Sequence, residues 1–277
     1  MYEEILYEVD GPAAVITLNR PEALNAFTYR TLAELRHAVA TAEADPAIVG
    51  IVATGAGRGF SAGMDMNALS GMTETGETGS GGDFGLRSRP GDPWMGDNFV
   101  DGFTYLMAVR KPIIAAINGA CAGLGSSIAC LLDLRFVEKQ AKLVTAFSQR
   151  GLVAEHGVSW ILPRLIGPSR ALDILWTSRR LTADEALELG IANRVCETGE
   201  ALADAKAYIS ELAASASPAS LMRMKQQVYR HLNMDLGEAM RESDRLMDES
   251  LKQADFGEGV RSFMEKRPPQ FGRIGEQ

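Results

Sequence analysis

Two short segments of small residues offer the clearest chemistry in this chain. FSAGMDM (residues 60–66) follows the apolar, β-branched run IVGIVATG (48–55), and INGACAGLGSS (117–127) follows PIIAAI (112–117). Small residues leave backbone N–H groups uncovered, so each turn can aim a donor at a ligand oxygen. A helix that opens at Leu124 would add the positive end of its dipole. One donor from each segment would form an oxyanion hole, which binds a carbonyl oxygen as that oxygen gains negative charge.

Taken together, the two turns resemble those of the crotonase family (enoyl-CoA hydratase/isomerase), and the resemblance covers nearly the whole chain. It implies that the carbonyl oxygen of a CoA thioester is bound by the backbone N–H groups of Met64 and Leu124. Asp65 matches an acidic residue that is expected to hold the loop rather than perform chemistry. The alternative is a pair of ordinary strand-to-helix turns. The residues that the resemblance places at the hole are Met64, Leu124, Ala62, Gly63, Gly123 and Asp65.

Two more segments resemble the parts of the family that bind CoA. NRPEALNAF is similar to the segment that wraps this group, which implies contacts of Ala23 and Leu24 with adenine and pantetheine. DFGEGVRSFMEKRPPQF is similar to the family's tail, where Phe263 and Lys266 match positions that touch adenine and phosphate, often across a subunit boundary. The alternatives are a simple turn into a helix for the first segment and a solvated basic helix end for the second.

The acid–base residues depart from the hydratase pattern. Hydratases of the family use two glutamates, and the matching positions hold Ser127 and Phe147, which are expected to contact substrate instead. GLVAEHGVSWILP resembles a family pattern in which isomerases carry an acid at the position of Glu155. The alternative for Glu155 is an exposed glutamate in a first helical turn, favoured there by the dipole. His156 is expected to point elsewhere, if the segment is helical, and to form a polar wall.

The resemblance implies an acyl-CoA enzyme that stabilises a thioester enolate. One carboxylate suffices for a Δ3-to-Δ2 enoyl-CoA isomerase: it removes a proton from C2 and returns it to C4. The alternatives are a 2-enoyl-CoA hydratase with a non-standard site and a catalytically weak acyl-CoA-binding protein. Hydrolysis or decarboxylation of a CoA ester would use the same hole. The sequence has no GxSxG elbow of a serine hydrolase and no GxGxxG of a nucleotide-redox fold.

Composition excludes several other classes. The net charge of −8 argues against a nucleic-acid partner, which usually needs a basic surplus. No apolar run approaches the ~18–20 residues of a membrane span. The three cysteines form no CxxC pair, so the sequence predicts no metal site and suits a reducing, cytoplasmic location. The resemblance implies no cofactor, since CoA is part of the substrate.

Strands and helices alternate in the first half of the chain, which predicts a layered α/β arrangement. Helices are expected at 27–45 and 98–110, and short strands at 13–18, 134–138 and 143–147. The resemblance implies the crotonase (ClpP-like) fold, a spiral of ββα units that carries the active site.

The second half of the chain becomes helical. We expect a core over residues 1–200 and a C-terminal helical region over 201–277. The resemblance implies that this region makes the contacts of a homotrimer or a dimer of trimers.

An insert over residues 71–98 is rich in Gly, Ser, Thr, Asp and Pro. Such a composition is expected to bury no core face and to be mobile. The insert is either a tolerated surface loop or a lid over the acyl pocket.

Overall fold

Two β-sheets form the framework of the protein, which we describe from a computed structural model over residues 2–75 and 82–275. The larger sheet has the order β1-β2-β3-β5-β7-β10, and every neighbouring pair except β1/β2 is parallel. Its strands are β1 Ile5–Asp10, β2 Ala13–Leu18, β3 Gly50–Gly55, β5 Ile113–Ile117, β7 Leu134–Glu138 and β10 Arg194–Cys196. The smaller sheet contains β4 Gly59–Ser61, β6 Ala120–Ala122, β8 Lys142–Val144 and β9 Leu181–Thr182.

The strands of the larger sheet follow each other into the smaller one. β3 leads to β4, β5 leads to β6 and then α4 (Leu124–Leu131), and β7 leads to β8. This repeated passage between the sheets is the ββα spiral that the family resemblance implies. The runs GIVATG and IIAAI are buried along their whole length, as expected of parallel strands covered on both faces. The turns after β4 and β6 therefore come to lie side by side, because β4 and β6 pair with each other.

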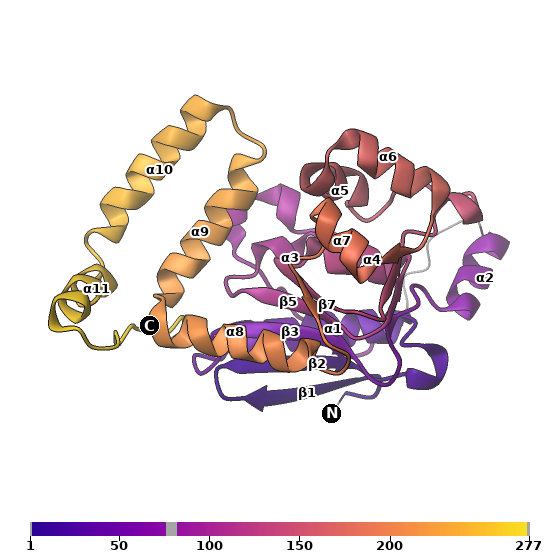
Figure 1. The fold of residues 1–277 in the computed structure, drawn as a ribbon, viewed down its shortest axis with the longest axis horizontal. Coiled ribbons are helices and arrows are strands. Elements are labelled where there is room, and N and C mark those ends of the chain that lie inside the picture. The colour runs from indigo at the N-terminus through magenta and orange to yellow at the C-terminus, as the bar shows by residue number, and fades with distance from the viewer. Residues whose placement is uncertain (1, 76–81, 276–277) are drawn as a thin grey trace.

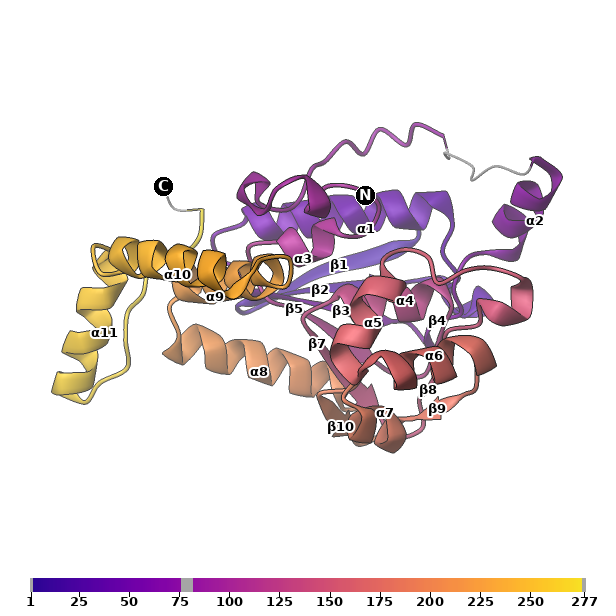
Figure 2. The ribbon, with the colours of Figure 1, turned by 90° about the horizontal axis from the view of Figure 1, so that it is seen from above.

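Helices cover both faces of the larger sheet. Figure 2 shows α1 (Tyr29–Ala44) on one face and α8 (Ala201–Ser215) on the other. α8 packs so closely that a Cβ on Gly50 would lie 2.8 Å from Cγ1 of Ile209. The remaining helices are α2 Met66–Thr75, α3 Tyr105–Ala108, α5 Val158–Ile166, α6 Pro168–Thr177, α7 Ala183–Leu189, α9 Pro218–His231, α10 Leu236–Ser250 and α11 Ala254–Glu265.

The last three helices extend away from the sheets. Figure 1 shows α10 and α11 at one end of the molecule and α2 at the other. Among the described residues no helix is long and apolar enough to cross a membrane. The predicted division at residue 200 stays a prediction, although α8, which follows it, packs against β3, β5 and β7.

Three sequence expectations need correction. The helix expected at 98–110 is only the four-residue α3, because Gly102 turns the chain with a φ of +54° just before it. The strand expected at 143–147 ends at Val144, and Ala146 then takes a left-handed φ of +60°. The insert does reach the core, because Met95 is buried and the Glu43 carboxylate accepts the Gly91 N–H at 2.7 Å. Residues 76–81 of the insert lie outside the described part.

Candidate active site

A cavity of about 630 Å³ opens where the turns after β4 and β6 meet the segment before α5. It contains most of the residues that the sequence places in a site, together with several that it does not. Its lining includes Ala23, Tyr29, Ala62, Gly63, Met64, Asp65, Phe103, Gly123, Leu124, Thr145, Phe147, Arg150, Leu152, Glu155 and His156.

The first turn leaves one backbone donor unused. Met64 forms a parallel bridge with Phe27, in which the Phe27 N–H donates to the Gly63 carbonyl at 2.7 Å. On the other side of the bridge, the Asp65 N–H donates to the Phe27 carbonyl at 2.9 Å. The Met64 N–H between them donates to no other residue in the described ranges. It is therefore available to a ligand in the cavity.

The second turn presents a donor at a helix start. Gly123, at a φ of +51°, is the N-cap of α4, and its own N–H donates to the Val144 carbonyl at 2.9 Å. The next residue, Leu124, begins the helix, so its N–H has no carbonyl one turn earlier to bond. No described residue accepts it. It also carries part of the positive end of the α4 dipole.

Glycines bring the two turns into contact. Gly63 has a φ of +101°, and a Cβ built on it would lie 3.0 Å from the Ala122 carbonyl oxygen and 3.4 Å from the Leu124 nitrogen. A Cβ on Gly125 would lie 2.8 Å from the Ser61 carbonyl oxygen. A side chain at either glycine would force the turns apart. This contact allows donors from two different turns to serve one oxygen atom.

Asp65 holds the first turn. Its carboxylate pairs with Arg20 at 3.0 Å and accepts the Asn67 N–H at 3.0 Å. Arg20 also donates to the Ala26 carbonyl, which fixes the chain before α1 against the turn. These contacts tie Asp65 to Arg20 and to the start of α2, in keeping with the loop-holding role that the resemblance implies.

Glu155 and His156 lie together on the cavity wall. Glu155 precedes α5 rather than lying in its first turn, so the alternative of an exposed helical glutamate does not hold. Nε2 of His156 lies 3.2 Å from Oε1 of Glu155. The expectation that His156 points elsewhere applied to a helical segment, and it does not hold here because His156 lies before α5 with a left-handed φ of +58°.

The two positions that hold glutamate in hydratases lie at different depths. Phe147 lines the cavity and is nearly buried. Ser127 is fully buried, its hydroxyl donates to the Gly123 carbonyl at 3.2 Å, and it does not line the cavity. It lines instead a space of about 20 Å³ that it shares with Phe147 and Cys130. The placement of Ser127 therefore gives no support to the predicted substrate contact.

Of the residues expected to bind CoA, some line the cavity and others do not. Ala23 lines the cavity, whereas Leu24, at a left-handed φ of +50°, does not. Phe263 is 85% exposed on α11 and Lys266 follows the end of that helix. Figures 1 and 2 place α11 at the opposite end of the molecule from α2 and its neighbouring cavity. Within one chain these two residues therefore do not join the cavity.

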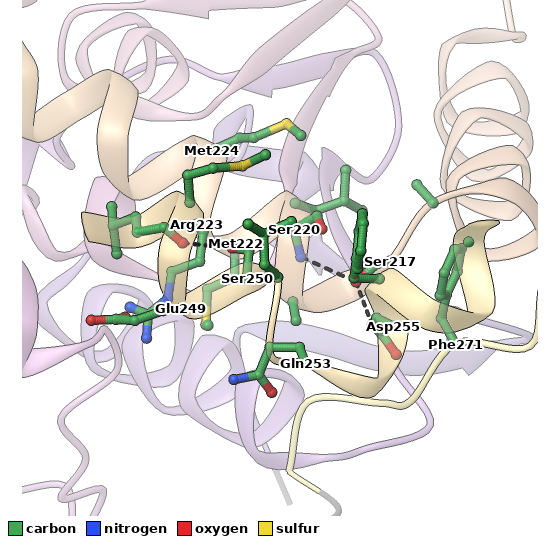
Figure 3. Close-up of a pocket in the computed structure, with 18 of the residues that line it drawn as sticks. Ser217, Ser220, Met222, Arg223, Met224, Glu249, Ser250, Gln253, Asp255 and Phe271 are labelled. Atoms are coloured by element: carbon green, nitrogen blue, oxygen red, sulfur yellow. Dashed lines mark hydrogen bonds between the residues drawn. The ribbon is translucent and has the colours of Figure 1, made fainter. Parts of the chain in front are cut away.

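A larger hollow of about 930 Å³ lies between α9, α10 and α11. Figure 3 shows methionines along it and a hydrogen-bonded pair, Ser217 and Asp255. Ser217 is the N-cap of α9 and accepts the Ser220 N–H at 3.2 Å, so this pair is explained by helix capping.

Other reactive groups are held inert or scattered. Burial raises the pKa of the Cys121 and Cys196 thiols to about 12, so both stay protonated at neutral pH. Within residues 2–75 and 82–275, no three His, Cys, Asp or Glu side chains come together as a metal site.

Sequence reasoning missed the Glu155–His156 contact and the ring of Phe103, which packs edge-on against His156 with centroids 5.2 Å apart. No periodic pattern in the sequence predicts these contacts, because they depend on the left-handed backbone conformation of His156.

Comparison with known proteins places the chain among enoyl-CoA hydratases and isomerases. The enoyl-CoA hydratase/isomerase family model matches residues 8–274. The chain is 34% identical over 275 residues to 1,2-epoxyphenylacetyl-CoA isomerase of Escherichia coli K12, covering 98% of this chain and 99% of that protein. It is 30% identical to short-chain-enoyl-CoA hydratase of Clostridium acetobutylicum, covering 95% of each. The solved enoyl-CoA hydratase of Mycobacterium tuberculosis H37Rv superposes with a TM-score of 0.82 at 26% identity, covering 98% of this chain and 99% of that one.

Proposed function

The chain belongs to the enoyl-CoA hydratase/isomerase family and is an enzyme with the crotonase fold, and from that premise we propose that it moves the double bond of an enoyl-CoA from Δ3 to Δ2. The observation that carries the proposal is the convergence of three groups on one cavity. Two unused backbone donors, at Met64 and Leu124, lie on touching turns, and the Glu155 carboxylate lines the same space.

The chemistry follows from these positions. The thioester oxygen accepts hydrogen bonds from the N–H groups of Met64 and Leu124, which stabilise the dienolate. Glu155 takes the proton from C2 and delivers it to C4. General acid–base catalysis of this kind contributes about 10²–10⁴ in rate. The proposed reaction needs no cofactor besides the CoA that the substrate carries.

Hydration is the second candidate. One relative is named a short-chain-enoyl-CoA hydratase, and Glu155 has His156 beside it as a second polar group. Against it, Ser127 and Phe147 replace both carboxylates of the hydratase pattern, and Ser127 does not line the cavity. A catalytically weak acyl-CoA-binding protein is the third candidate.

The test is turnover of a panel of 3-enoyl-, 2-enoyl- and 3-hydroxyacyl-CoA esters, measured by absorbance and mass spectrometry. The wild-type protein should convert 3-enoyl esters best. Glu155→Gln keeps the shape but removes the base, so turnover should fall by at least ~10², with little change in affinity for a CoA ester. Glu188→Gln, an exposed glutamate of α7, is the matched control and should remain active. Near-wild-type turnover in Glu155→Gln would remove this residue from the mechanism.

The C-terminal helices support a proposal about assembly. α10 and α11 expose Leu236, Met240, Met247, Phe263 and Met264, and a large apolar hollow lies between these helices and α9. Burial of apolar surface is the dominant favourable contribution to most protein–protein association. We propose a homotrimer or a dimer of trimers in which Phe263 and Lys266 reach the CoA of a neighbouring copy. Sedimentation that shows a monomer at micromolar concentration would contradict it.

A further inference from the structure

Next to Glu155, the site contains a residue to which the proposed function assigns no task. We propose that His156 is a positioning residue: it donates a hydrogen bond from Nε2 to Oε1 of Glu155, so that Oε2 faces the substrate. The proposal rests on the proposed function, because it concerns the orientation of the base in that reaction.

The backbone explains how two consecutive residues share one cavity. Consecutive side chains point to opposite faces in a strand and about 100° apart in a helix. Here Glu155 and His156 lie in a turn, where His156 has a φ of +58° and Gly157 a φ of +84°. A left-handed φ is uncommon outside glycine and costs on the order of 1–3 kcal/mol, so the surrounding structure must hold it. The result is that both side chains line the same space.

The proposed bond requires a donor and an acceptor. A carboxylate only accepts hydrogen bonds, and a neutral imidazole has one N–H and one bare nitrogen. Nε2 of His156 lies 3.2 Å from Oε1 of Glu155, within ion-pairing distance, and the proton must lie on Nε2 for the proposed hydrogen bond to form. The edge of Phe103 against the ring, with an interplanar angle of 77°, limits rotation of the imidazole.

No other described side chain holds the Glu155 carboxylate in position. Within residues 2–75 and 82–275, His156 is the one side chain in ion-pairing contact with the Glu155 carboxylate. Of the charged groups that line the cavity, Asp65 pairs with Arg20 at 3.0 Å, and Arg150 donates to the Ala146 carbonyl at 3.0 Å. The Glu155 side chain is 37% exposed, so without His156 it would be free to turn toward solvent.

The proton that leaves the substrate returns to it within the site. The C2–H bond breaks, its proton binds Oε2 of Glu155, and its electron pair enters the dienolate held by the Met64 and Leu124 N–H groups. The O–H bond then breaks, a C4–H bond forms, and the electrons return to the C2–C3 double bond and the thioester carbonyl. C2 and C4 lie on either side of C3, so one fixed oxygen has to reach both. Misplacement of a reacting group by about 1 Å can cost 10²-fold in rate.

The first test compares two substitutions at the same position. His156→Phe keeps a ring against Phe103 but has no donor, so kcat on the best 3-enoyl-CoA should fall about tenfold or more while KM changes less than about threefold. His156→Gln keeps an N–H that can reach the same oxygen and should retain at least about a third of wild-type kcat. His37→Phe removes a histidine that bonds Tyr2 outside the cavity and should leave kcat unchanged.

The outcomes separate this proposal from the proposed function. Wild-type kcat in His156→Phe overturns the proposal, while a loss of turnover in Glu155→Gln would still support the function. Equal losses in the Phe and Gln variants also overturn it, because the donor would then not matter. A second readout does not need turnover: the long-range ¹H–¹⁵N spectrum of the three histidines should show the Nε2–H tautomer at His156. The Nδ1–H tautomer would contradict the proposal even if no CoA ester were converted.

Discussion

Gly63 offers the sharpest test of the two-turn oxyanion hole, because one added methyl group meets both turns. In Gly63→Ala the new Cβ would start 3.0 Å from the Ala122 carbonyl oxygen and 3.4 Å from the Leu124 nitrogen. The first distance is too short for comfortable contact with backbone, so the turns must move apart by a few tenths of an ångström. The methyl group would also lie against the Leu124 N–H, where the substrate oxygen is expected.

Two separate losses follow from this substitution. The φ of +101° strains any residue with a side chain, which should lower the free energy of unfolding by about 1–3 kcal/mol. Losing one donor of an oxyanion hole costs about 2.7–4 kcal/mol in the transition state, or about 10²–10³ in kcat. The assays are urea unfolding and kcat on the best CoA ester.

Gly199→Ala is the control for backbone strain. Gly199 has a φ of +87° in the turn between β10 and α8, and a Cβ there would have no neighbour within 4 Å. This variant should lose stability to a similar extent and keep its kcat. If Gly63→Ala also keeps kcat within about threefold of wild type, the two turns do not form the hole.

Two further substitutions test the core and the cavity wall. Phe147→Ala removes the ring that lines both the cavity and the space of about 20 Å³, so kcat/KM for long acyl chains should rise relative to short ones. The free energy of unfolding should fall by about 3–5 kcal/mol. An unchanged chain-length preference would refute this prediction. Burial lowers the pKa of Lys111 from 10.5 to about 8. Between these pH values the unfolded chain therefore binds more protons than the folded protein. The contribution of Lys111 to the free energy of unfolding consequently rises with pH over this range. That rise amounts to at most about 1.4 kcal/mol per pH unit, and Lys111→Met should remove it. Urea unfolding of the wild-type protein and the variant at several pH values measures the difference. Parallel pH dependences of the two proteins would contradict the prediction.

The sequence predicts the parts of the site that depend on backbone turns. Small residues after β4 and β6 indicate two turns with free N–H groups, and the structure places Met64 and Leu124 in them because neighbouring parallel strands bring their ends together. The strands β3 and β5 follow from apolar runs that have no polar face. These features are local or depend on adjacent strands, so composition and order suffice to find them.

Other features depend on single backbone angles or on distant partners. The left-handed φ of His156 turns its side chain toward Glu155, and no periodic pattern contains that information. Met95 enters the core from a polar insert because the carboxylate of Glu43, about fifty residues earlier, accepts the Gly91 N–H. Ser127 has a polar side chain but is buried, because its hydroxyl bonds back to the carbonyl one turn earlier in α4. Such contacts require the three-dimensional structure.

The most direct test of the account is a crystal structure of the protein with a bound, unreactive acyl-CoA. The account predicts that the thioester oxygen lies within hydrogen-bonding distance, about 2.7–3.2 Å, of both the Met64 and the Leu124 nitrogen, with a Glu155 oxygen facing the acyl chain at C2. A carbonyl oxygen more than about 4 Å from both nitrogens, beyond hydrogen-bond range, would contradict it.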